Sequence, residues 1–194
     1  MALGGFTPST NDHNGTFANE MGPIKEVHAF WLAGMSCDGC SIATIGAKNP
    51  SIEQLLLQRI PGLPKVILHH PVLAVESGEK FMEPYRQAAR GELDAPYVVL
   101  YEGSVADESI AAAFGGYWSA MGMEDLGDGK WRPYPTAKML DDLAPGAAAV
   151  IAVGTCATWG GVPAAQGNVT HSMGVMDFLA KDYRSALGLP VINV

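Results

Sequence analysis

Hydrophobic and polar positions along this chain fall into alternating blocks that predict strands separated by helices. Five short apolar runs have the length and composition of buried strands. They read VHAFWLAG from Val27, KVILH from Lys65, YVVLY from Tyr97, AAAVIAV from Ala147 and PVINV from Pro190. Because each run is nearly continuously apolar, we expect a parallel sheet that is buried on both faces. The predicted fold class is therefore α/β, with one flavodoxin-like doubly wound domain.

Helix signals occupy the segments between these runs. Helices are expected to start in the loop after the first strand and to cover residues 51–60, 79–90, 136–144 and about 172–185, with an Ala-rich helical stretch near Ile110. Ser51 follows Asn49-Pro50 in the position of a helix N-cap. Helical spacing then predicts an inward face made of Ile52, Leu55, Leu56 and Arg59. The Gly-rich segment 116–135 interrupts the pattern and is expected to be an irregular excursion.

The domain organisation follows from where the periodicity begins. Residues 1–24 are polar and rich in Gly, Asn and Thr, which predicts a flexible N-terminal arm. Residues 25–194 form the predicted domain, and 48% apolar residues with 16% charged residues are typical of a globular chain.

Charge and targeting signals narrow the partners and the compartment. The net charge of −8 argues against nucleic acid or an anionic membrane surface as the main partner. No apolar run approaches the roughly 18 residues that cross a bilayer. The N-terminal residues lack both a secretory pattern and a twin-arginine pair. We therefore expect a cytoplasmic location, with any membrane contact made through partner subunits.

Three cysteines carry the candidate chemistry. Cys37 and Cys40 form a CDGC motif after the first predicted strand, and Cys156 lies in a GTC motif after the fourth. An odd number of cysteines fits poorly with a secreted disulfide framework. Because the carboxyl ends of parallel strands meet at one edge of a sheet, we expect all three thiols to converge there.

Three thiolates at one edge are compatible with an iron–sulfur cluster, with structural zinc, or with a redox or inert thiol group. Zinc usually takes four ligands, and a thioredoxin-type pair has no use for a distant third cysteine. A 3Fe-4S cluster needs three thiolates, whereas a 4Fe-4S cluster needs a fourth ligand outside these three residues. Glycines let backbone N–H groups approach cluster sulfurs, and five flank the thiols: Gly34, Gly39, Gly154, Gly160 and Gly161.

The segments WLAGMSCDGCSIA, YEGSVA and GTCATWGGVPAA together resemble the small subunit of nickel–iron hydrogenases. The resemblance runs from about Val27 to Val194. It implies a flavodoxin-like domain that holds the proximal iron–sulfur cluster beside the NiFe centre of a large subunit. Cys37, Cys40 and Cys156 correspond to three cluster ligands. Residues expected around the cluster are Gly39, Glu102, Thr155 and Trp159.

The implied function is electron transfer, with no catalytic residue in this chain. In such a hydrogenase the large subunit oxidises dihydrogen, and electrons pass through the cluster to an acceptor, a quinone or a redox protein. A higher oligomer of heterodimers is expected. The absence of an export signal resembles the cytosolic-facing uptake branch of the family.

Two features depart from the family pattern. The family supplies a fourth cysteine in a GCP motif after the strand that here ends PVINV, and it continues into a second domain with further clusters. We therefore expect an incomplete version of a longer subunit, lacking the C-terminal cluster domain, in preference to a natural short form with a three-ligand cluster.

Two alternative functions stay open. One is a related iron–sulfur subunit of a quinone oxidoreductase, although that family has adjacent cysteines where this chain has CDGC. The other is a zinc-stapled binding module without redox chemistry.

Several conspicuous residues have simpler interpretations. Trp31 is expected in the core, and His69-His70-Pro71 is expected to be a capped turn rather than a metal site. Trp159 is the better candidate to shield a cluster or to meet a large subunit.

Overall fold

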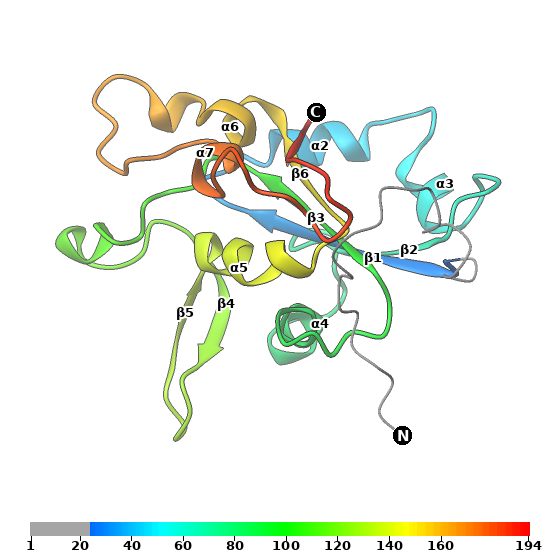
Figure 1. Ribbon diagram of the computed structural model, residues 1–194, viewed down its shortest axis with the longest axis horizontal. Coiled ribbons are helices and arrows are strands. Elements are labelled where there is room, and N and C mark those ends of the chain that lie inside the picture. Colours follow the sequence, from blue (N-terminus) through cyan, green and yellow to red (C-terminus); the bar gives the residue numbers. More distant parts are fainter. Residues whose placement is uncertain (1–23) are drawn as a thin grey trace.

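The computed structural model describes residues 24–194, so the expected arm lies outside the described residues except for Ile24. Its main sheet has five parallel strands in the order β2-β1-β3-β6-β7 (Figure 1). These are β1 (Glu26–Ala33), β2 (Lys65–His69), β3 (Tyr97–Glu102), β6 (Ala149–Val153) and β7 (Ile192–Asn193). Numbered within this sheet alone, the order is 2-1-3-4-5, which is the flavodoxin arrangement. The predicted fold class is confirmed.

Helices cover the sheet on both sides, as Figure 1 shows. One layer holds α2 (Gly39–Ile45) and α3 (Ile52–Leu56). The other holds α4 (Glu79–Ala89) and α5 (Thr136–Leu143), and Val175 of α7 (Val175–Phe178) lies in the core cluster on this side. Helix α6 (Gly154–Trp159) begins directly after β6, at the carboxyl edge of the sheet. Short 3-10 turns lie at Ala111–Phe114, Ala144–Gly146 and Val162–Ala164. No helix in the described residues is long and apolar enough to cross a membrane.

Successive residues of each strand face opposite layers, and this alternation builds two halves of the core. Phe30 and Val99 are fully buried in the cluster that includes Tyr85 of α4. On the opposite face, Trp31 and Leu100 help to line an apolar cavity of about 100 Å³ beneath α2 and α3. Trp31 is only 3% exposed, which confirms its predicted place in the core.

The helix after Asn49-Pro50 is shorter than its sequence pattern indicates. Ser51 caps α3 in a capping box with Gln54, as the sequence predicts. The chain then leaves the helix, and Gln58 takes a positive φ of 54°. Arg59 therefore lies beyond the helix and is exposed, so its predicted inward position is wrong.

Two further expectations about secondary structure are wrong. The helix expected over 172–185 is only the four residues of α7, because the chain turns away soon after, with Ala180 at φ 72°. The excursion 116–135 contains an antiparallel hairpin of β4 (Ala120–Asp125) and β5 (Trp131–Pro135). Its Gly and Pro residues obscure the alternation that normally reveals a strand.

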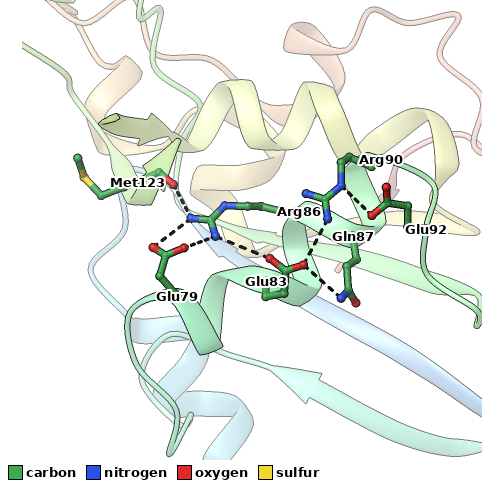
Figure 2. A network of polar contacts seen from close by, with 7 residues as sticks. All are labelled: Glu79, Glu83, Arg86, Gln87, Arg90, Glu92 and Met123. Carbon is green, nitrogen blue, oxygen red and sulfur yellow. Dashed lines mark hydrogen bonds and ion pairs between the residues drawn. The ribbon is translucent and has the colours of Figure 1, made fainter. Parts of the chain in front are cut away.

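A polar network on α4 fastens this hairpin to the domain (Figure 2). The Arg86 guanidinium donates to Glu79 at 2.6 Å and to the backbone carbonyl of Met123 in β4 at 2.8 Å. It also lies 5.5 Å from the ring centroid of Trp131 in β5. The Arg86 side chain is only 13% exposed, whereas Arg90, one turn later, is 48% exposed and pairs with Glu83 and Glu92.

Replacing Arg86 by methionine is expected to destabilise the domain by about 1–2 kcal/mol, because the hairpin loses its charged hydrogen bond and its cation–π contact. Arg90→Met is the matched control and should change stability very little, since exposed ion pairs contribute little. Urea unfolding of both variants measures the difference. Equal losses in the two variants would contradict the role assigned to Arg86.

Candidate functional site

The three cysteines lie at the carboxyl edge of the sheet, two of them in the first turns of short helices. Cys37 is in the loop between β1 and α2, and Cys40 is the second residue of α2. Cys156 is the third residue of α6, directly after β6. All three are free thiols; Cys37 is exposed, and the other two are half-buried.

The loop that carries Cys156 touches the sulfur of Cys40. A methyl group added at Gly154 would overlap Cys40 Sγ, and Gly154 has a φ of +81°. Burial, followed by the negative charges of Glu102, Cys37 and Cys156, raises the pKa of the Cys40 thiol. The structure therefore brings the CDGC loop and the GTC loop together, although they are far apart in the sequence.

Glycine backbone lies close against each sulfur. A Cβ on Gly161 would overlap Cys156 Sγ, and one on Gly39 would lie 3.3 Å from Cys37 Sγ. Thiolates next to bare backbone are the donors and the surroundings that iron–sulfur clusters use. By donor chemistry and by the close approach of bare backbone to the sulfurs, the residues present fit such a cluster.

The three thiols do not form a compact single-ion site. Within residues 24–194, no group of three or more His, Cys, Asp or Glu side chains could hold one metal ion. With Zn–S bonds of about 2.3 Å, a tetrahedral zinc holds its sulfurs only about 3.8 Å apart. A cluster of several irons accepts thiolates that are more widely spaced, so this arrangement does not favour zinc.

Glu102 ends β3 and joins it to the cysteine loop. Its carboxylate is 2% exposed and accepts four hydrogen bonds. Oε1 accepts the backbone N–H groups of Cys40 at 2.9 Å and Ser41 at 3.3 Å. Oε2 accepts the indole N–H of Trp31 at 3.0 Å and the Ser41 hydroxyl. Burial acts to raise the pKa of Glu102, but the hydrogen bonds from Ser41 and Trp31 outweigh it and hold the pKa below its ordinary value.

Sequence reasoning missed two members of this network, Ser41 and His70. Ser41 Oγ lies 2.9 Å from His70 Nε2, and both residues are buried. His70 Nδ1 accepts the backbone N–H of Val72 at 3.1 Å, so the predicted capped turn is present. The dipeptide His69-His70 was the one feature of the sequence that pointed to a histidine near this network. The sequence pattern alone does not show which of the two histidines faces the cysteines.

The remaining predicted site residues lie at the surface of α6. Thr155 is exposed, and Trp159 is 71% exposed at the end of the helix. Trp159 is therefore accessible to a partner chain.

The fold and the family that matches it place the chain among the flavodoxin-like subunits of oxidoreductases. The model of the NADH ubiquinone oxidoreductase 20 kDa subunit family matches residues 37–194, and the chain belongs to this family. Its resemblance to the small subunits of nickel–iron hydrogenases is also confirmed, by relatives and by solved structures.

The small subunit of the periplasmic NiFeSe hydrogenase of Desulfomicrobium baculatum is 32% identical over 158 residues, which are 81% of this chain and 47% of that protein. The hydrogenase-2 small chain of Escherichia coli K12 is 28% identical over 84% of this chain and 37% of its own length. The solved actinobacterial-type NiFe hydrogenase of Ralstonia eutropha H16 aligns with a TM-score of 0.81 at 47% identity, over 88% of this chain and 48% of that one. The chain thus spans about half the length of these relatives or less.

The contact between Gly154 and Cys40 leads to a testable difference between two glycines. Gly127, in the hairpin turn, has the same φ of +81° but nothing within 4 Å of an added Cβ. Gly127→Ala should therefore cost only about 1–2 kcal/mol of backbone strain. Gly154→Ala should cost about 1–3 kcal/mol more, because the Cys40 sulfur must move.

Denaturant unfolding compares the two variants, and mass spectrometry follows the rate at which Cys40 is alkylated. Faster alkylation is expected in Gly154→Ala alone. Equal stability losses with an unchanged alkylation rate would show that Gly154 does not pack against Cys40.

Proposed function

We propose that this chain is the electron-transfer small subunit of a nickel–iron hydrogenase and that it holds the proximal iron–sulfur cluster through Cys37, Cys40 and Cys156. One observation carries the proposal: the sulfur of Cys40 lies against the loop that bears Cys156. The three thiols come from segments that resemble those of hydrogenase small subunits, and the relatives named above carry that description.

A cluster at this edge would supply one-electron oxidation and reduction, and the chain would supply its position and surroundings. The first turns of α2 and α6 hold Cys40 and Cys156 on backbone fixed by β1 and β6. Glu102 fixes the Cys40 backbone from the end of β3. Three thiolates in this chain would suffice for a 3Fe-4S cluster, and a 4Fe-4S cluster would take a further ligand.

A large subunit holding the NiFe centre is the proposed partner, and exposed apolar side chains on the cysteine-bearing helices support it. Ile42 of α2 is 67% exposed and Trp159 of α6 is 71% exposed, while Val162, just beyond α6, is 85% exposed. Exposed apolar groups of this kind mark protein interfaces. The electron acceptor, a quinone or a redox protein, would receive electrons through the assembled heterodimer or its higher oligomer.

The two alternatives differ from this proposal in what they predict. The matched family takes its description from a respiratory subunit, so hydrogen-dependent activity is the property that separates the two redox functions. Zinc without labile sulfide would indicate the binding module.

The test uses the whole small subunit co-purified with its large subunit under anaerobic conditions. Iron and acid-labile sulfide are expected, together with hydrogen-dependent reduction of a dye. Cys156→Ala should lower the cluster content and the rate of dye reduction by about 10–100-fold or more. Losses of that size follow when only the surroundings of a metal site are disturbed, and here a ligand itself is removed. Val169→Ala, a change at a 62% exposed position in the loop between α6 and α7, is the control and should leave both unchanged.

Two results would overturn the proposal. Zinc in place of iron and sulfide would exclude the cluster, and a complex that holds the cluster but ignores hydrogen would exclude the hydrogenase. A Cys156→Ala variant with full iron content would remove Cys156 from the ligand set.

A further inference from the structure

A chain of hydrogen bonds connects His70 to the backbone of Cys40 through Ser41 and Glu102. His70 is 2% exposed, Ser41 is 2% exposed and Glu102 is 2% exposed, so the chain is closed off from solvent. Trp31 packs against the His70 ring, with 4.8 Å between ring centroids, and also donates to Glu102. The group therefore joins β1, β3 and α2 to the residue that follows β2 at one buried point.

The direction of each hydrogen bond follows from the donors available. His70 Nδ1 accepts the Val72 N–H, so it carries no proton, and the proton of the neutral ring lies on Nε2. Nε2–H then donates to Ser41 Oγ, which leaves the hydroxyl proton to donate to Glu102 Oε2. Donors linked in one direction polarise one another and strengthen the bond to the final acceptor.

The second carboxylate oxygen of Glu102 binds the backbone at the start of α2. Oε1 takes the backbone N–H groups of Cys40 and Ser41, which are therefore directed at the carboxylate and not at a sulfur. Among residues 24–194, no Lys, Arg or His forms an ion pair with Glu102. The site thus holds a buried negative charge that is balanced only by hydrogen-bond donors.

The buried charge of Glu102 and the N–H groups that it takes from the sulfurs both change the reduction potential of a neighbouring cluster, and in the same direction. N–H donors to cluster sulfurs and solvent exposure shift reduction potentials, and a nearby negative charge disfavours the more negative reduced state. A carboxylate that adds charge and withdraws N–H donors lowers the reduction potential. A substitution that weakens the hydrogen bonds holding the Glu102 carboxylate in place therefore raises the reduction potential of the cluster.

Resting on the proposed function, we propose that His70 is a positioning residue for the proximal cluster. Through Ser41 it holds Glu102 in the orientation that captures the Cys40 and Ser41 backbone N–H groups, and it thereby keeps the cluster potential low. His70 touches neither a sulfur nor the reacting atoms of the partner subunit. Its neighbour His69 points to the opposite face of the sheet, where it stacks on Phe30 with 4.6 Å between ring centroids.

The experiment is an EPR-monitored redox titration of the cluster in the complete complex, with variants along the chain. Glu102→Gln removes the charge and should favour reduction about tenfold, which is 59 mV for one electron. Ser41→Ala and His70→Leu should also raise the reduction potential, but by a smaller amount. The equilibrium constant for reduction should increase about two- to fivefold, because each variant loses one hydrogen bond.

Two histidine variants separate positioning from general stability. His70→Gln keeps a donor toward Ser41 and an acceptor for the Val72 N–H, so it should restore the potential to near that of the unmodified protein. His69→Gln is the matched control on the other face of β2 and should leave the potential unchanged. Unfolding measurements on the same samples report any loss of stability separately.

The outcomes distinguish this inference from the proposed function. If the unmodified complex shows no iron–sulfur signal, the proposed function fails. If the signal is present and both Ser41→Ala and His70→Leu keep the unmodified potential, the positioning role fails while the proposed function stands. If His70→Leu loses the cluster, the reduction potentials of Ser41→Ala and His70→Gln test the positioning role instead, because their side chains fit the same space.

Discussion

The buried carboxylate of Glu102 is the interaction on which the cysteine edge depends. It lies at the end of β3, the central strand, and takes hydrogen bonds from Trp31 in β1 and from the first turn of α2. Burying a carboxylate costs several kcal/mol unless its oxygens are paired, and here four donors pair them. The position of Cys40 is therefore coupled to the sheet itself, and a shift of the loop would leave a buried charge unsatisfied.

The sheet edge supplies geometry that no single loop could supply. β1 and β6 both pair with β3, so their carboxyl ends lie one strand apart on either side of Glu102. A short helix with a cysteine in its first turn follows each strand: α6 begins directly after β6, and α2 begins after a short loop from β1. Glycines at the strand ends then let a sulfur approach the opposite loop, which is why Gly154 contacts Cys40.

Most of this architecture was accessible from the sequence, because apolar runs and turn residues carry it. The five strands, the flavodoxin order and the meeting of CDGC with GTC follow from continuous apolar runs and from the shared edge of parallel strands. The hairpin over 120–135 was not accessible, since Gly122 and Pro133 break its alternation. The position of His70 beside Ser41 was not accessible for another reason: strand alternation assigns His69 and His70 to opposite faces, and only the β1–β2 register decides which of them meets α2.

The different packing on the two faces of the sheet agrees with the proposed function, in which this chain holds a redox group and has no catalytic residue of its own. On the α4 side, Arg86 fastens a hairpin by charged hydrogen bonds, and the packing is that of an ordinary core. On the α2 side, the polar chain from His70 to Glu102 is fully enclosed and ends at backbone N–H groups. Enclosed networks of this kind are rigid when every member is satisfied, and a rigid polar surrounding changes little between oxidation states. An electron-transfer site benefits from that rigidity, because small rearrangement between oxidation states lowers the barrier to transfer.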